Sequence, residues 1–222
     1  MAWYRYKEYA PNTLYHIYNR GVNRQPIFLR FSDYIFYLKR LRQYIKKYNV
    51  DLLGFCLMPN HIHLLVWQKT SLPVYKFIHS LHTSYSMVFN LRHKRIGGLF
   101  QDAFKQKIVD NDEYVAQVLK YIHTNPLNHR FPMSGRSGKK EILIKTKEQL
   151  LEIPFSSARE YATNNFNIVS RDLVNKILPD PLRAIDFSTL FVEDYVAPYL
   201  IDNTNEDEGD ESESESEGEG EN

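Results

Sequence analysis

Apolar and polar residues follow one another along the chain in patterns that predict short strands and longer helices. Residues 14–19 and 99–109 alternate between apolar and polar positions, which predicts two strands. Two apolar stretches, 50–58 and 61–68, are separated by the turn residues Pro59-Asn60, which predicts a β-hairpin. These four strands supply enough edges and faces to form one sheet.

Helical spacing of apolar residues fills the gaps between these strands. It predicts a first helix over 33–48 with Ser32 as its N-terminal cap, and a second over 73–92 that begins with a proline. A third helix begins at 111 or 112 and stops near Asn125-Pro126. The order β-α-β-β-α-β is that of the ferredoxin-like α+β fold, an antiparallel sheet with helices on one face. The third helix follows it.

The remainder of the chain differs in composition. Residues 131–150 contain glycines and a Lys139-Lys140 pair, which indicates a surface loop, and 152–201 contain short helical patterns. Residues 202–222 hold 11 acidic residues, no Lys or Arg and no apolar residue, so we expect a disordered tail. The sequence therefore divides into 1–130, an extension at 131–201 that packs on or near this first part, and the acidic tail.

Charge is distributed unevenly along the chain. The total of 28 Lys and Arg against 27 Asp and Glu nearly cancels, but without the tail 16 acidic residues remain. The body therefore carries about +12, which suits a polyanionic partner such as nucleic acid. The tail serves solubility or, as a sharper hypothesis, competes with nucleic acid for this basic surface.

Few features of the sequence bear on the cellular compartment or on membrane insertion. We expect no membrane span, since no apolar run is long enough to cross a bilayer, and the N-terminus lacks the apolar stretch of a signal peptide. Cys56 is the single cysteine, so it cannot form an internal disulfide. These features favour a cytoplasmic protein.

The triplet His61-Ile62-His63 is the first candidate for chemistry. In a strand, His61 and His63 point to the same side and could bind one metal ion, although the bare triplet favours an ordinary strand that carries two polar residues. In the third helix, Tyr121 and Asn125 are four residues apart and share a face. The Asn125 amide oxygen suits Mg²⁺ or Mn²⁺, and a phenol can act as a covalent nucleophile. Most of the 16 tyrosines must be packing residues, and Tyr121 could be one of them.

Several longer motifs occur together in a fixed order: YHIYNRGVNRQPIF (15–28), GFCLMPNHIHLLV (54–66), LHTSYSMVFNLRHKRIGGLFQDAFK (81–105), YIHTNP (121–126) and PFSSAREY (154–161). In this combination the chain resembles the single-tyrosine transposases of the HUH nuclease group, including the REP-associated tyrosine transposases of bacteria. The resemblance extends over 13–161. It implies a ferredoxin-like core and assigns 1–130 as an HUH transposase catalytic domain acting in the bacterial cytoplasm, near the nucleoid.

The resemblance also implies a reaction and a site. Members cut and rejoin single-stranded DNA beside hairpins with a divalent metal, Mg²⁺ or Mn²⁺. The implied metal ligands are His61, His63 and, with less support, Asn125. Tyr121 is the implied nucleophile that forms a 5′-phosphotyrosine link, with Tyr114 as a rival seven residues earlier. His123 lies on another side of this helix and is expected to be structural or exposed.

Positively charged residues are candidates for phosphate contacts. They lie in the first loop, at the end of the second helix and on the fourth strand: Arg20, Arg24, Arg92, Lys94, Arg95, Lys105 and Lys107. Many relatives have an arginine where this chain has Ala103, and Lys105 or Lys107 could replace it. Two alternatives to the transposase remain open: a domesticated protein that binds DNA hairpins without cleaving them, and an unrelated metallohydrolase. Relatives include monomers and homodimers, and the sequence does not decide between them.

Overall fold

The computed structural model describes residues 9–130 and 155–178, with side chains up to 126 in the first range. Its four strands form one antiparallel sheet in the order β2-β3-β1-β4. The strands are β1 (Thr13–Arg20), β2 (Val50–Leu57), β3 (His61–Gln68) and β4 (Lys105–Val109). This is the strand order of a ferredoxin-like α+β fold, as predicted.

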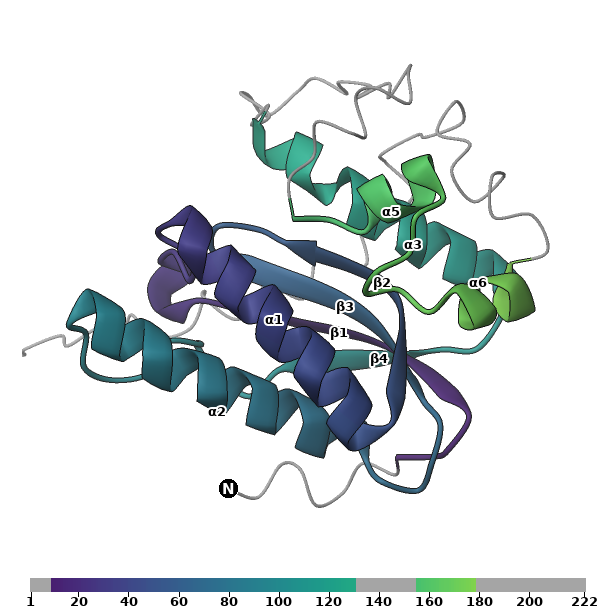
Figure 1. Cartoon of the computed structure of the whole chain (residues 1–222), viewed down its shortest axis with the longest axis horizontal. Helices are drawn as coiled ribbons and strands as arrows, with labels where there is room; N and C mark the ends of the chain where they lie inside the picture. Colours follow the sequence, from purple (N-terminus) through teal and green to yellow (C-terminus); the bar gives the residue numbers. More distant parts are fainter. Residues whose placement is uncertain (1–8, 131–154, 179–222) are drawn as a thin grey trace, which may run out of the picture. The chain divides into compact units, whose positions relative to one another are not determined.

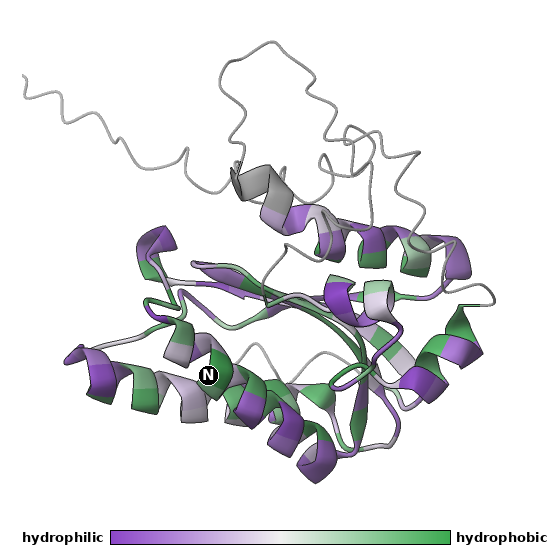
Figure 2. Ribbon diagram, turned by 45° about the horizontal axis from the view of Figure 1, so that its top comes forward, coloured by the Kyte–Doolittle hydropathy of each residue, from purple (hydrophilic) through white to green (hydrophobic). Residues whose placement is uncertain are grey.

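Helices lie on both faces of this sheet (Figure 1). On one face α1 (Phe31–Tyr48) and α2 (Val74–His93) pack side by side. On the other face lie α3 (Asp112–Arg130), α5 (Ala158–Thr163) and α6 (Arg171–Ile177), with α3 against β2 and β3. Green and purple segments alternate along α1 and α2 in Figure 2, as expected for helices with one buried side.

Strand register decides which side chains share the α3 face. Residues directly opposite each other in an antiparallel pair point to the same side of the sheet. Tyr18 is opposite His63 on β3 and Lys105 on β4, and Arg20 is opposite His61. The predicted histidine pair therefore shares its face with residues of β1 and β4: His16, Tyr18, Arg20, Lys105 and Lys107.

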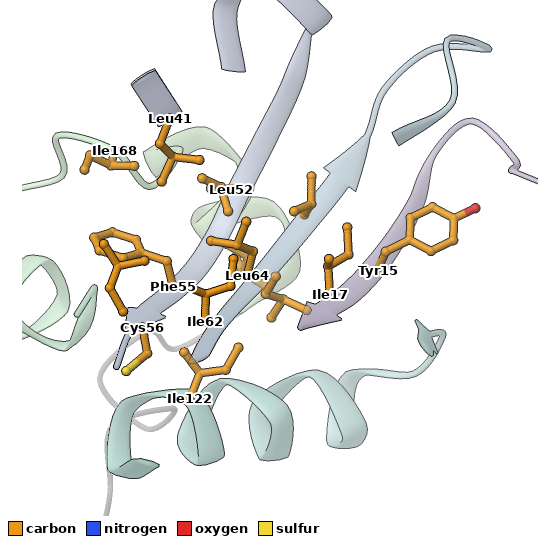
Figure 3. Close-up of a cluster of buried hydrophobic side chains, with 14 of the residues drawn as sticks. Tyr15, Ile17, Leu41, Leu52, Phe55, Cys56, Ile62, Leu64, Ile122 and Ile168 are labelled. Atoms are coloured by element: carbon orange, nitrogen blue, oxygen red, sulfur yellow. The ribbon is translucent and has the colours of Figure 1, made fainter. Parts of the chain in front are cut away.

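The opposite sides of these strands contribute to the hydrophobic core. Ile17, Leu52, Ile62 and Leu64 are fully buried, and Figure 3 shows them close to one another on β1, β2 and β3. Ile122 of α3 is also fully buried, so this helix is part of the packed structure and not an external appendage. The burial of Ile122 thus shows that α3 is packed against the sheet face that carries the histidines.

The start of α1 differs from the prediction. The helix begins at Phe31 instead of Asp33, and Ser32 is not its cap. The buried carboxylate of Asp33 accepts hydrogen bonds from the backbone N–H groups of Leu29 and Arg30, at 3.1 and 3.0 Å. An acidic side chain at the third helical position satisfies the donors that precede the helix, so no capping serine is needed.

The strand predicted over 99–109 begins only at Lys105. Upstream of it, Phe100 forms an isolated bridge with Gly21, and the Asn19 side chain donates to the carbonyl of Asp102 at 3.3 Å. Two backbone hydrogen bonds, from the Gln101 N–H to the Arg20 carbonyl and from the Val22 N–H to the Leu99 carbonyl, join this side-chain bond in holding residues 99–104 as a loop at the end of β1.

The third helix does not stop at Asn125-Pro126, as the sequence predicted, but continues through Pro126 to Arg130. Proline removes one backbone donor from the helix. In the preceding turn the Thr124 hydroxyl donates to the carbonyls of Lys120 and Tyr121, at 3.0 and 3.3 Å. The turn that carries Tyr121 is therefore tied by side-chain as well as backbone hydrogen bonds.

Residues 155–178 return to the sheet and run along β2, which is an edge strand. The backbone N–H of Ser157 donates to the Phe55 carbonyl at 2.9 Å, and that of Ser170 donates to the Leu52 carbonyl at 2.9 Å. This segment covers hydrogen-bonding groups that an edge strand would otherwise expose. The loop predicted at 131–150, residues 179–201 and the acidic tail lie outside the described residues. In the described part, no helix is both long and apolar enough to cross a membrane.

Candidate active site

The two histidines of β3 direct one ring nitrogen each at the same amide on α3. His61 Nε2 is 3.2 Å from Asn125 Oδ1, and His63 Nε2 is 3.3 Å from Asn125 Nδ2. His63 and Asn125 are each only 5% exposed. The prediction that the histidines share a face and that Asn125 faces them is thus confirmed as geometry.

The hydrogen bonds around His61 leave two acceptors facing each other. The Asn60 side-chain nitrogen donates to the Arg24 carbonyl at 3.3 Å, so Asn60 Oδ1 is the atom that accepts from His61 Nδ1 at 2.8 Å. His61 Nε2 of the neutral ring then carries a lone pair, and it points at the Asn125 carbonyl oxygen. A proton on the imidazole or a cation between the two atoms satisfies both.

The atoms of this arrangement are chemically suited to a divalent cation. Two neutral imidazole nitrogens and one amide oxygen are suitable ligands for a metal of intermediate hardness. Among the described residues, no three His, Cys, Asp or Glu side chains are grouped so that they could hold a metal, so the amide is needed to complete a three-residue set.

Tyr121 lies beside this set, on the same side of α3 as Asn125. Its ring meets the ring of His63 edge-on, with 5.3 Å between the ring centroids. Burial raises the pKa of the Tyr121 phenol to about 12, although a hydrogen bond with the Asn125 side chain opposes this shift. Tyr114 is two turns earlier, about 10 Å along the helix axis, so the contact with His63 favours Tyr121 over its rival.

Sequence reasoning missed His16, which lies behind His63. His16 is fully buried, and its Nε2 is 3.1 Å from His63 Nδ1. Burial, with a smaller effect of the positive charge of Lys107, lowers the pKa of His16 to about 3, so the ring is neutral. A polar residue in the middle of a buried strand, LYHIYN, was the available signal.

His123 and Ser157 fix α3 to the sheet on the side away from Tyr121. Both are fully buried, and His123 Nε2 is 2.8 Å from the Ser157 hydroxyl oxygen. The same hydroxyl accepts from the Phe55 N–H at 2.9 Å. Gly54 allows the close approach, because a Cβ atom there would lie 2.6 Å from a methyl group of Leu119 on α3. His123 is therefore structural, as predicted.

Three of the seven predicted phosphate-contacting residues lie on the histidine face of the sheet. Lys105 and Lys107 project from β4, and Arg20 lies opposite His61 with its Nε 2.7 Å from Gln101 Oε1. Positive charge therefore flanks the candidate metal ligands on the side of β1 and β4.

The other four lie at the ends of loops and helices. Arg24 is exposed, and its carbonyl accepts a hydrogen bond from the side chain of Asn60, the residue before His61. The Arg95 guanidinium is 3.4 Å from Gln25 Oε1. Lys94 caps the end of α2 and is exposed. Arg92 differs, because it pairs with the buried Asp33 at 3.7 Å on the face of the sheet that α1 and α2 cover.

The fold and the site geometry agree with what comparisons with known proteins found. A ferredoxin-like sheet with a histidine pair facing a helix is typical of the HUH class of transposases. The sequence model of the family described as IS200-like transposases matches residues 9–125, more than half of the chain. The protein belongs to this family of transposases, which act in DNA transposition and recombination. A search of curated proteins gave no match.

Two solved structures are similar to the chain, and the first of them shares its fold. The structure of a REP-associated tyrosine transposase bound to a REP hairpin has a TM-score of 0.55 and 16% identity, covering 77% of this chain and 91% of that one. A transposase structure from Deinococcus radiodurans has a TM-score of 0.40 and 18% identity, covering 52% of this chain and 92% of that one.

Proposed function

We propose that the protein is a metal-dependent endonuclease and strand transferase for single-stranded DNA that acts beside hairpins. The observation that supports this most is the convergence of His61 Nε2, His63 Nε2 and the Asn125 amide beside the ring of Tyr121. Membership of the IS200-like transposase family and a fold shared with a hairpin-bound transposase agree with it. DNA is accordingly the proposed partner.

The proposed nucleophile is the Tyr121 hydroxyl oxygen. It attacks the phosphorus of one phosphodiester, and the bond from phosphorus to the 3′-oxygen breaks. The 5′-phosphate then remains on the tyrosine. The phenol gives up its proton and the 3′-oxygen takes one up to leave as a hydroxyl, so protons balance over the step. One ester is exchanged for another, so attack by a second 3′-hydroxyl can reverse the step and join new ends without ATP.

His61, His63 and Asn125 would hold the divalent ion, which we propose to be Mg²⁺ or Mn²⁺. When bound, such an ion polarises a phosphate oxygen and offsets the negative charge that builds up on the phosphate. The side chains of Arg20, Lys105 and Lys107 share this face of the sheet and would attract the DNA backbone. Asn125 would also keep the phenol oriented through its hydrogen bond with Tyr121.

The direct test is a covalent-adduct assay with hairpin oligonucleotides whose flanks are randomised. Because the tyrosine keeps the 5′-phosphate, a strand labelled at its 3′ end should become attached to the protein, whereas a 5′ label should appear in a short free product. Mn²⁺ or Mg²⁺ should be required. Tyr121→Phe should abolish the adduct, and Tyr114→Phe on the same helix should leave it intact.

The result also distinguishes the two readings of the family relationship. A wild-type protein that binds the hairpins but forms no adduct with either metal would be a hairpin-binding protein without cleavage activity. An adduct that persists in Tyr121→Phe and disappears in Tyr114→Phe would move the nucleophile to the earlier turn of α3.

A further inference from the structure

His16 is a buried histidine that contacts a proposed metal ligand from the side opposite to the metal. It is on β1, two positions along the strand from the residue paired with His63. Its Nε2 is 3.1 Å from His63 Nδ1, and the two rings are nearly parallel with centroids 5.3 Å apart. The other nitrogen of His63 faces Asn125. Both nitrogens of His63 are thus engaged by fixed neighbours.

These contacts determine which nitrogen of His63 carries the proton. With its amide nitrogen turned toward His63, as in this structure, Asn125 donates to His63 Nε2, which places the proton of the neutral ring on Nδ1. His63 Nδ1 then donates to His16 Nε2. This is the tautomer in which Nε2 has a lone pair available for a metal.

We propose that His16 is a positioning residue, which fixes the ring orientation and tautomer of His63 so that His63 Nε2 can bind the ion. His61 has an equivalent support on its own Nδ1, the Asn60 side-chain oxygen, at 2.8 Å. Each proposed histidine ligand therefore has one nitrogen held by a neighbour and one directed at the shared site. The inference rests on the proposed function for the role of the metal, but the orientation of His63 exists without it.

His16 also touches the proposed nucleophile. The ring of Tyr121 meets that of His16 edge-on at 6.3 Å between centroids and meets His63 edge-on at 5.3 Å. Tyr18, which shares the face of β1 with His16, also stacks on the ring of His63, with 5.9 Å between the ring centroids. His16 is accordingly the residue that links the ligand and the tyrosine by direct contact with both rings, and its loss should affect the two together.

The first experiment measures the tautomer directly by nitrogen-15 NMR of histidine-labelled full-length protein without metal. His63 should show its proton on Nδ1. In His16→Phe the Asn125 contact remains but the buried Nδ1–H of His63 loses its acceptor, so the fraction of His63 protonated on Nε2 should rise. A wild-type His63 protonated on Nε2 would overturn the proposal. This part of the test uses wild-type protein alone and does not depend on the folding of a variant.

The second experiment measures Mn²⁺ affinity by calorimetry. Supports of metal-binding histidines typically contribute about 10–100-fold in affinity, so His16→Phe should weaken binding by that factor. His16→Gln places an amide oxygen where it can accept from His63 Nδ1 and should restore most of the affinity. His82→Phe is the matched control, since His82 is also buried but stacks on Phe100 on the other face of the sheet.

Unchanged Mn²⁺ affinity in His16→Phe, or equal losses in His16→Phe and His16→Gln, would overturn the assignment and leave His16 a packing residue. Failure of the proposed function looks different. In that case wild-type protein would bind no Mn²⁺ and form no DNA adduct, while the NMR measurement would still decide whether His16 sets the tautomer of His63.

Discussion

The contact between Ser157 and His123 makes the attachment of α3 to the sheet measurable. The Ser157 oxygen accepts from the Phe55 N–H at 2.9 Å and lies 2.8 Å from His123 Nε2, while the hydroxyl donates to the Phe55 carbonyl at 3.2 Å. With the hydroxyl proton directed at that carbonyl, His123 Nε2 is the donor to the Ser157 oxygen. Ser157→Ala removes the acceptor for two buried N–H groups at once.

The expected loss follows from counting those two groups. The Phe55 carbonyl keeps its bond from the Ser157 backbone N–H, so only the Phe55 N–H and the His123 ring N–H lose a partner. A buried donor without a partner costs about 1–3 kcal/mol. Ser157→Ala should therefore lower the free energy of unfolding by about 2–4 kcal/mol, the lower part of the range for two such groups.

Urea unfolding followed by circular dichroism gives this number, and a double-mutant cycle assigns it. Combining Ser157→Ala with His123→Leu removes the orphaned ring donor, so the pair should cost about 1–3 kcal/mol less than the sum of the single changes. Thr163→Ala is the control, because its exposed hydroxyl donates only to the Arg159 carbonyl within α5. Additive losses, or a loss in Ser157→Ala no larger than that in Thr163→Ala, would refute the reasoning.

Further outcomes concern pH and salt. Burial lowers the pKa values of His82 and His123 from 6.5 to about 3, so the folded state keeps them neutral and stability is lost as pH falls below 6.5. At pH 5 each should cost about 2 kcal/mol, seen as a lower urea midpoint than at pH 7; an unchanged midpoint would contradict this. The raised pKa of Tyr121 acts at alkaline pH, where stability is lost as pH rises from 10 to about 12. Over this range Tyr121→Phe should therefore lose about 2–3 kcal/mol less unfolding free energy than the wild type. Lys107→Ala should reduce the slope of log affinity for single-stranded DNA against log salt by about 0.7, whereas Lys46→Ala on α1 should not change it.

Local periodicity was enough to predict most of the fold. Alternation placed β1 and the β2–β3 hairpin within a residue of their bounds, because side chains in strands and helices repeat at fixed spacings. The errors occurred where a side chain replaces a backbone partner. The Asp33 carboxylate starts α1 early, and the Asn19 amide delays the start of β4. The Asp33 contact is local but polar, so the hydrophobic pattern does not show it. The Asn19 contact joins residues 83 positions apart and depends on the path of the chain between them.

The candidate site was predictable only in its local pairs. His61 with His63, and Tyr121 with Asn125, follow from the spacing within one strand and one helix. His16 was missed because its contact with His63 spans 47 residues and depends on the register between β1 and β3. The same holds for Ser157 and His123, which are brought together by the path of the chain beyond α3.

The proposed ligands have an electrostatic property that distinguishes this site from one built on carboxylates. Among the described residues no carboxylate joins His61 and His63, and Asn125 is neutral. A divalent ion held by uncharged ligands keeps its full charge toward a phosphate. The same ligands bind that ion less strongly than carboxylates would, because no ligand charge attracts it. The uncharged ligands thus explain both the full charge that the ion would present to DNA and the low affinity of the protein for the ion when DNA is absent.

Metal and DNA should therefore bind cooperatively, since the phosphate supplies the negative charge that the protein ligands lack. Tyr121→Phe protein, which cannot cleave, allows Mn²⁺ to be titrated with and without a bound hairpin oligonucleotide. Couplings between two sites typically amount to about 5–150-fold, and linkage requires Mn²⁺ to strengthen DNA binding by the same factor as DNA strengthens Mn²⁺ binding. A variant that replaces Asn125 with Asp adds one negative charge and should bind Mn²⁺ more tightly alone but show weaker coupling. Equal Mn²⁺ affinity with and without DNA would show that the phosphate does not complete the site.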